Sequence, residues 1–171
     1  MEKSNQNNLL TARIAGFTLL FYIAVGLSGM AFKQGNPGSA VIAILTSLSA
    51  LVLGVTFYSI TNKQQQEIAM MGLVCRVVEA VPGEGAVFFA VASTCFSWLL
   101  YRGRLVPVPL ALLGIFASVL LLIFLPIQHA GYFGGAGNWN NPVTWGIWFF
   151  MLVYEIWLGI WLMVKGIQQS V

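Results

Sequence analysis

Six long runs of apolar residues, separated by short polar segments, constrain the fold of this chain more than any other feature. Most of these runs approach the ~20 residues that an α-helix needs to cross the hydrocarbon core of a bilayer. Of the 171 residues, 58% are hydrophobic and only 8% are charged, whereas soluble domains carry about 25% charged residues. So few charges cannot cover a surface that faces water. The sequence therefore predicts an all-α, polytopic membrane protein.

Turn-forming and charged residues mark the ends of the apolar runs and set the boundaries of the expected helices. We expect a polar cytoplasmic tail at 1–12, one six-helix transmembrane domain at 13–166 and a cytoplasmic tail at 167–171. The first run is long enough to span the bilayer, so we expect it to be retained rather than removed as a signal peptide. The six expected helices cover residues 13–32, 39–60, 66–81, 86–101, 105–127 and 143–164.

The distribution of Lys and Arg predicts the orientation, because cytoplasmic loops are enriched in both residues. With six helices and the N-terminus inside, Lys33 is the only Lys or Arg of the tails and loops that lies outside. An alternative merges 68–101 into one crossing, but it divides the basic residues more evenly and makes a helix too long for a ~30 Å core. We therefore expect a multi-pass protein of the cell inner membrane, with both termini cytoplasmic. The basic residues expected inside are Lys3, Arg13, Lys63, Arg102, Arg104 and Lys165.

Aromatic residues near the ends of two expected helices agree with this arrangement. Trp98 and Tyr101 close the fourth helix near the inner face, and Trp145 and Trp148 open the sixth at the outer face. Trp and Tyr are enriched at both membrane–water interfaces. Their positions are therefore those that the six-helix arrangement predicts.

Three ionisable residues lie well inside the expected helices: Arg76, Glu79 and Glu155. A charge near the bilayer centre costs several kcal/mol, so it faces a partner or a cavity. Counted from the inner face at 1.5 Å per residue, Arg76 and Glu155 reach a similar depth of about 14–15 Å. Glu79 follows Arg76 by three positions and shares its helical face. We predict an intramembrane cluster in which Arg76 pairs with Glu155, with Glu79 as a second partner.

Two interpretations of this cluster remain open. In the first it is a structural ion-pair group that fixes how the third helix packs on the sixth. In the second it is a polar pocket or ion relay, because two carboxylates and one guanidinium leave one carboxylate that a proton or a cation would complete. The corresponding functions are the binding or passage of a small solute or ion, and a non-catalytic accessory or assembly role in a membrane complex.

Several other functions find no support in the sequence. The chain contains no Asp and a single histidine, His129, which excludes a Ser/His/Asp triad and a haem held by two histidines of this chain. Cys75 and Cys95 lie in apolar runs without a CxxC spacing, so we expect buried apolar residues rather than a metal site. We predict no catalytic residue and no metal, assign no cofactor, and do not favour an enzyme.

The expected partners follow from the same composition. A net charge of +3 that is scattered over the chain does not indicate nucleic-acid binding. The lipid bilayer is the partner that the composition requires, and a small solute or ion is the partner that the cluster suggests. Homo- and hetero-oligomers both remain open.

Four short motifs stand at the ends of expected helices or inside them. Together they resemble the bacterial membrane family catalogued as domain of unknown function 4386. The resemblance implies a bacterial inner-membrane protein with several spans and agrees with the choice of the three charged residues, but it implies no activity, because the family has none assigned. The chain departs from the family pattern at Pro82–Gly85, where relatives usually carry a longer segment. The motifs are ARIAG at Ala12–Gly16, RVVEA at Arg76–Ala80, YRGRLVP at Tyr101–Pro107 and EIWLGIWLMVKG at Glu155–Gly166.

Overall fold

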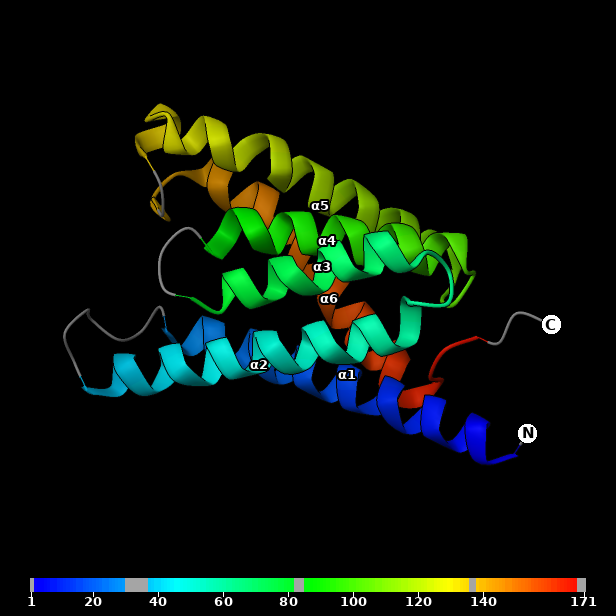
Figure 1. Ribbon diagram of the computed structural model, residues 1–171. Helices are drawn as coiled ribbons and strands as arrows, with labels where there is room; N and C mark the ends of the chain where they lie inside the picture. The colour runs from blue at the N-terminus through cyan, green and yellow to red at the C-terminus, as the bar shows by residue number, and fades with distance from the viewer. Residues whose placement is uncertain (1, 30–36, 82–84, 136–137, 169–171) are drawn as a thin grey trace.

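A computed structural model describes residues 2–29, 37–81, 85–135 and 138–168. Within these residues the chain forms six α-helices and one short 3-10 turn, and no strand (Figure 1). The all-α class that the sequence predicts is therefore confirmed. The helices are α1 (Glu2–Gly29), α2 (Pro37–Thr61), α3 (Gln66–Glu79), α4 (Gly85–Arg102), α5 (Val108–His129) and α6 (Pro142–Val164), and the 3-10 turn η1 (Tyr132–Gly134) lies between α5 and α6.

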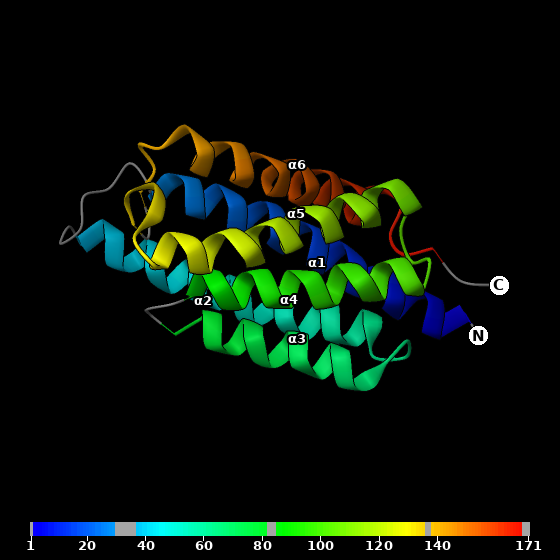
Figure 2. The same ribbon diagram turned by 90° about the horizontal axis from the view of Figure 1, so that it is seen from above.

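The six helices form a closed ring. Each helix packs against the next one along the chain, and α6 packs against α1. Consecutive helices run in opposite directions, so both ends of the chain lie at the same end of the bundle (Figures 1 and 2). We call this the terminal end, which also holds the α2–α3 and α4–α5 connections, and the opposite end, which holds η1, the distal end. Because the ring closes, side chains from nonadjacent helices meet at its centre.

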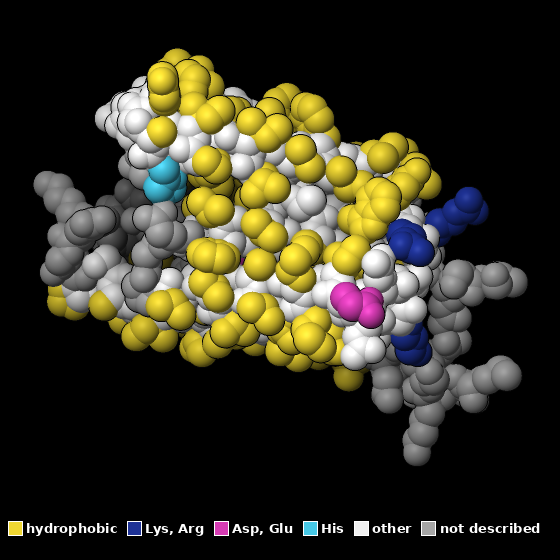
Figure 3. Space-filling view, turned by 45° about the horizontal axis from the view of Figure 1, so that its top comes forward, with side chains coloured by type: hydrophobic (Ala, Val, Ile, Leu, Met, Phe, Trp, Pro, Cys, Tyr) yellow, Lys and Arg dark blue, Asp and Glu magenta, His cyan; other side chains and the backbone are white. Residues whose placement is uncertain are grey.

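Much of the outer surface is apolar, while basic side chains gather at the terminal end (Figure 3). Among the described side chains, Arg13, Lys63, Arg102, Arg104 and Lys165 are all exposed. Large apolar side chains are exposed on the faces of all six helices. A protein surrounded by water does not expose so much apolar surface, so these faces require lipid around them. This surface is that of a membrane protein.

Five of these helices are long and apolar enough to cross a membrane: Leu9–Gly29 of α1, and all of α2, α4, α5 and α6. The protein is therefore a multi-pass membrane protein. The remaining helix, α3, has 14 residues and rises only ~21 Å at 1.5 Å per residue. Whether α3 counts as a sixth span depends on the bilayer around it, and the six-span arrangement stays a prediction.

The helix boundaries differ from the expected ones by one to three residues at most ends and by more at the start of α1, and two of these differences have a clear physical reason. Helix α1 begins at Glu2 and not at residue 13, because polar residues continue a helix readily once it leaves the hydrocarbon region. Helix α5 begins at Val108 and not at residue 105, because Pro107 disfavours helical geometry in the residue before it. Of the expected break at Pro82–Gly85, only Gly85 is described, and it opens α4.

The short connection between α4 and α5, at the terminal end, holds the last described residues in place. Leu105 lies between α4 and α5 and is buried. Its carbonyl accepts a hydrogen bond of 2.7 Å from the backbone N–H of Gln168, which follows α6. Gly166 has a φ of +70°, a left-handed conformation that favours glycine and turns the chain after α6. The segment after α6 therefore returns to the α4–α5 connection.

A pair of glycines closes the ring between α1 and α6. A Cβ atom added to Gly16 would lie 2.6 Å from the carbonyl oxygen of Gly159. A Cβ atom added to Gly159 would lie 2.8 Å from the side chain of Leu20. Neither position has room for a side chain, so glycine permits the close backbone approach that is common between transmembrane helices.

Candidate functional site

Arg76 lies in the last turn of α3 and is 2% exposed. Its neighbour on α2 is Gly54, where an added Cβ atom would come within 2.9 Å of the Arg76 Cβ atom. The absence of a side chain at Gly54 therefore lets α2 and α3 approach each other at the level of Arg76. The Arg76 side chain extends into the ring and contacts residues of α1, α2 and α4.

The guanidinium of Arg76 is held mainly by Glu79, three residues further along α3. Its Nη1 atom lies 3.1 Å from Oε2 and 3.3 Å from Oε1 of Glu79. Its Nη2 atom donates to the Ser93 hydroxyl of α4 at 3.4 Å. The hydroxyl of Tyr22, on α1, donates to Oε1 of Glu79 at 2.7 Å. The pair is thus connected to α1 and α4 through these two hydroxyl groups.

Two aromatic rings cover the guanidinium. Its central carbon lies 5.0 Å from the ring centre of Phe89 and 5.9 Å from that of Tyr22. The face of an aromatic ring attracts a cation, and this attraction is stronger where water is excluded. Arg76 therefore has a carboxylate, a hydroxyl and two rings as partners, and its charge is balanced inside the bundle.

The expected ion pair between Arg76 and Glu155 is not formed. Within the described residues the ion pair of Arg76 is with Glu79, so the order of the two predicted partners was wrong. The physical reason is the ring: α3 packs between α2 and α4, and α6 lies between α5 and α1. Glu79, one turn away on the same helix, reaches the guanidinium without crossing the bundle.

Glu155 nevertheless comes close to Arg76. Both residues line a central void of about 10 Å³, together with Ser93 and Tyr154. Such a volume holds roughly one water molecule. Glu155 is 7% exposed, and its Oε1 atom has no hydrogen-bond partner within the described part of the chain. The three predicted residues therefore lie around one centre, with Glu79 paired and Glu155 lacking an ion-pair partner.

Glu155 also borders a much larger cavity on the distal side. This cavity has a volume of about 540 Å³ and lies between α1, α2 and α6. We call it the aromatic cavity, because its lining includes Tyr22, Trp139, Trp145, Trp148 and Phe149. Ligand pockets commonly have volumes of roughly 300–1,000 Å³ and mostly apolar walls. By size and lining, the aromatic cavity is therefore a candidate ligand site with Glu155 at its inner end.

A second cavity, of about 350 Å³, borders the other carboxylate, and we call it the Glu79 cavity. It shares three lining residues, Tyr22, Thr46 and Trp148, with the aromatic cavity. These residues therefore stand between the two spaces. Each carboxylate of the cluster thus borders a cavity, whereas Arg76 lines only the small central void among the cavities described.

The aromatic rings form a continuous series from the bundle interior to the distal end. The ring of Phe89 lies 5.8 Å from that of Trp148, and Trp148 lies 5.6 Å from Trp139. Trp139 in turn lies 5.3 Å from Trp145. Because Phe89 also covers Arg76, the series links the buried charges to the tryptophans at the distal end. The sequence predicts that Trp145 and Trp148 lie at the outer membrane–water interface, but it does not reveal the series of rings.

Tyr22 is the site residue that sequence reasoning missed. It follows Arg13, the first residue of the first expected span, by nine positions, and Arg76 follows Glu67 by the same spacing. The depth count that selected Arg76 would therefore also have selected Tyr22. A tyrosine does not stand out in an apolar run, however, because its ring is itself apolar.

A second polar contact lies near the centre and was also missed. The hydroxyl groups of Ser97 on α4 and Tyr154 on α6 are 2.8 Å apart, and both residues are buried. Gly114 of α5 makes room for this contact, since an added Cβ atom would overlap the Tyr154 ring. Three helices thus meet at one hydrogen bond, next to Glu155.

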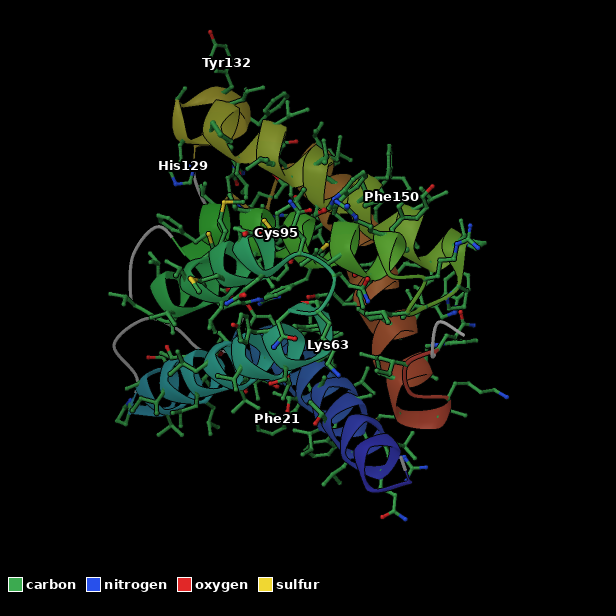
Figure 4. The ribbon with its side chains drawn as sticks, turned by 45° about the vertical axis from the view of Figure 1, so that its right-hand side comes forward. Phe21, Lys63, Cys95, His129, Tyr132 and Phe150 are labelled. Carbon is green, nitrogen blue, oxygen red and sulfur yellow. The ribbon has the colours of Figure 1, made fainter. Side chains whose placement is uncertain are left out.

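The weaker sequence candidates lie away from the cluster or carry no site. Cys75 and Cys95 are buried and form no disulfide, as expected of small apolar residues. Figure 4 shows Cys95 inside the bundle, whereas Phe21 and Phe150 point away from it. His129 is exposed at the distal end, where its Nδ1 atom is 2.9 Å from the carbonyl oxygen of Leu125.

Residues 83–166 match the family model described as Domain of unknown function (DUF4386). This match confirms the resemblance that the sequence motifs indicate. It contains the motifs Tyr101–Pro107 and Glu155–Gly166 and begins after Arg76. No curated protein and no solved structure matches the chain. The function must therefore be inferred from the geometry of the site.

Proposed function

We propose that this membrane protein, whose residues 83–166 belong to a family without an assigned function, binds a small solute in the aromatic cavity. One observation carries the proposal: Glu155 is 7% exposed and lines the inner end of a cavity of about 540 Å³, and its buried Oε1 atom has no hydrogen-bond partner among the described residues. A buried carboxylate without a partner is costly. Such a residue is expected where a ligand completes its interactions.

The two carboxylates have different roles in this proposal. Glu79 is bound by Arg76 and Tyr22, and the contacts of Arg76 reach α4 as well, so this pair holds the centre of the ring together. Glu155 makes no ion pair in the described part of the chain and borders the larger space. The structural interpretation, in which the cluster fixes the third helix on the sixth, does not describe the Arg76–Glu79 pair, which connects α3 to α1 and α4. We propose the functional interpretation for Glu155.

The cavity supports binding more directly than passage. Beyond Glu155, the central void of about 10 Å³ is too small for a solute larger than water. A solute that enters from the distal end would stop at the carboxylate in this conformation. A purely accessory subunit would need neither this cavity nor an unpartnered carboxylate, so we favour solute binding over that role.

We further propose that the protein lies in a bacterial inner membrane with six spans, α3 being a short one. The exposed basic residues at the terminal end support a cytoplasmic position for that end. In this orientation the aromatic cavity faces the extracytoplasmic side. A solute would then be taken from outside the cell or from the outer leaflet.

Accessibility of the cavity in the membrane tests this proposal. Leu152 lines the aromatic cavity, whereas Leu162, on the same helix, is fully buried in the core. Each is replaced by cysteine in a background in which Cys75 and Cys95 are alanine, and a polar, membrane-impermeant maleimide is added from the distal side. We expect Leu152→Cys to react and Leu162→Cys to stay unlabelled. Equal, negligible labelling of both folded variants would overturn the proposal.

A further inference from the structure

We infer that the solute is a lipophilic organic cation, such as a quaternary ammonium, a phosphonium or a protonated amine with apolar substituents. The inference rests on the proposed function and adds the charge and chemical class of the ligand. It is carried by two features of the aromatic cavity: the carboxylate of Glu155, which forms no ion pair within the described residues, and an apolar wall to which five aromatic side chains contribute.

The charges around the centre determine the sign of the charge that the ligand carries. Among the described residues, the charged side chains buried at this centre are Arg76, Glu79 and Glu155. Arg76 and Glu79 neutralise each other at 3.1 Å, which leaves the carboxylate of Glu155 as the surplus charge. A monovalent cation next to Glu155 completes the balance. An anion would meet Glu155 directly and Glu79 behind Tyr22, and both would repel it.

The walls of the cavity set the chemistry of the rest of the ligand. Trp139, Trp145 and Trp148 form a connected group, with ring centres 5.3 and 5.6 Å apart. Aromatic faces of this kind attract cations that carry little water, and quaternary ammonium groups are the usual example. Tyr22 and Phe149 extend the same wall. The cavity therefore matches a cation whose charge is spread among apolar substituents.

An inorganic cation fits this cavity less well. Metal cations such as Ca²⁺ and Mg²⁺ require about six or more oxygen ligands, and Mg²⁺ also keeps several of its waters. Besides Glu155, the cavity offers the hydroxyls of Thr46 and Tyr22, and the Tyr22 hydroxyl already donates to Glu79. A lipid acyl chain would satisfy the apolar walls but would leave the Glu155 carboxylate unpartnered. Both occupants are outcomes that the test distinguishes.

Two probes of the same shape and opposite charge test the inference. Tetraphenylphosphonium is a lipophilic cation, and tetraphenylborate is its anionic counterpart. Binding of each to the full chain in lipid nanodiscs is followed by quenching of tryptophan fluorescence, with empty nanodiscs measured in parallel to subtract partitioning. We expect saturable binding of tetraphenylphosphonium, with an affinity at least about tenfold higher than that of tetraphenylborate, equivalent to about 1.4 kcal/mol.

Substitution of Glu155 tests whether the preference for the cation comes from its carboxylate. Glu155→Gln keeps the shape of the side chain and should lower the affinity for tetraphenylphosphonium by about tenfold or more. Glu67→Gln is the matched control, because Glu67 is an exposed carboxylate on α3 that does not line the aromatic cavity. It should bind the cation like the unmodified protein. Glu155→Asp keeps the charge and should retain the preference for the cation, even if Glu155→Gln folds poorly.

The outcomes separate this inference from the proposed function. Equal binding of the two probes, unchanged by Glu155→Gln, indicates a site for neutral lipophiles or acyl chains and overturns the inference of a cation. If Leu152→Cys is still labelled in that case, solute access to the cavity stands. Displacement of tetraphenylphosphonium by millimolar Mg²⁺ but not by choline would indicate an inorganic cation site and would also overturn the inference.

Discussion

The guanidinium of Arg76 lies 3.1 Å from the carboxylate of Glu79, and both belong to α3. A pair within one helix does not by itself hold two helices together. Here the connection is made by neutral groups, since Tyr22 of α1 donates to Glu79 and Ser93 of α4 accepts from Arg76. The pair therefore acts as a polar node for three helices of the ring, and its loss should affect the whole bundle.

Removal of the guanidinium should be the most damaging change at this node. Arg76→Leu leaves two buried carboxylates without a cation and should destabilise the protein by ~3–5 kcal/mol. Glu79→Leu should cost less, because Glu155 lines the same central void as Arg76 and partly replaces the lost partner. Unfolding by sodium dodecyl sulfate, followed by circular dichroism, measures these losses. The double variant should lose much less than the sum of the two, whereas additive losses would show that the pair contributes no coupling energy.

The hydrogen bond between Ser97 and Tyr154 should show a similar dependence on its partner. Ser97→Ala leaves the buried Tyr154 hydroxyl unpaired and should cost ~1–3 kcal/mol. In the Tyr154→Phe background the same change should cost little, because no hydroxyl is left unpaired. Ser118→Ala is the control, since the buried Ser118 hydroxyl bonds to carbonyl groups of its own helix. Thermal unfolding in detergent measures the losses, and an equal loss from Ser97→Ala and Ser118→Ala would contradict the expectation.

The contact between α1 and α6 should tolerate no side chain at Gly16. Gly16→Ala places a Cβ atom against the Gly159 carbonyl, and such overpacking typically costs 1–3 kcal/mol, which we take as roughly the expected loss. Gly26→Ala on the same helix is the control, because an added Cβ atom there meets no atom within 4 Å. It should be neutral or slightly stabilising, since alanine favours a helix more than glycine does. Comparable melting temperatures for the two variants would refute this packing.

The position of both chain ends on one side of the membrane can be measured with single cysteines. Gln6, Gln168 and Asn140 are exposed. Gln6 lies near the start of α1 and Gln168 follows α6, so both belong to the terminal end, whereas Asn140 lies between η1 and α6 at the distal end. In a cysteine-free background, an impermeant thiol reagent added to intact spheroplasts should label Asn140→Cys alone. Gln6→Cys and Gln168→Cys should be labelled only after lysis. Labelling of either one from outside would show that the six-span orientation is wrong.

The helices were largely predictable because their ends carry physical markers. Pro37 and Pro142 open α2 and α6, and the polar loop 62–65 separates α2 from α3. These boundaries differ from the expected ones by few residues. The start of α1 was not predictable in the same way, because a helix can continue into water after it leaves the bilayer, and no Pro or Gly marks its first residue.

The site was predictable in depth but not in its pairing. Counting residues from the inner face placed Arg76 and Glu155 at similar levels, and both line the same central void. Which carboxylate binds the guanidinium depends on the circular order of the helices, and a sequence does not state this order. The cavities were beyond prediction for the same reason, since Tyr22, Thr46 and Trp148 come from three different helices.

The shortness of α3 has a consequence for the surrounding lipid. In the six-span arrangement its 14 residues, ~21 Å in length, are matched against a hydrocarbon layer that averages ~30 Å. A bilayer accommodates such a mismatch by thinning locally, and flanking polar groups then draw the headgroup region inward. The distal headgroups should therefore dip along α3 toward Glu79, so that the protein itself deforms the leaflet from which a lipophilic cation would arrive.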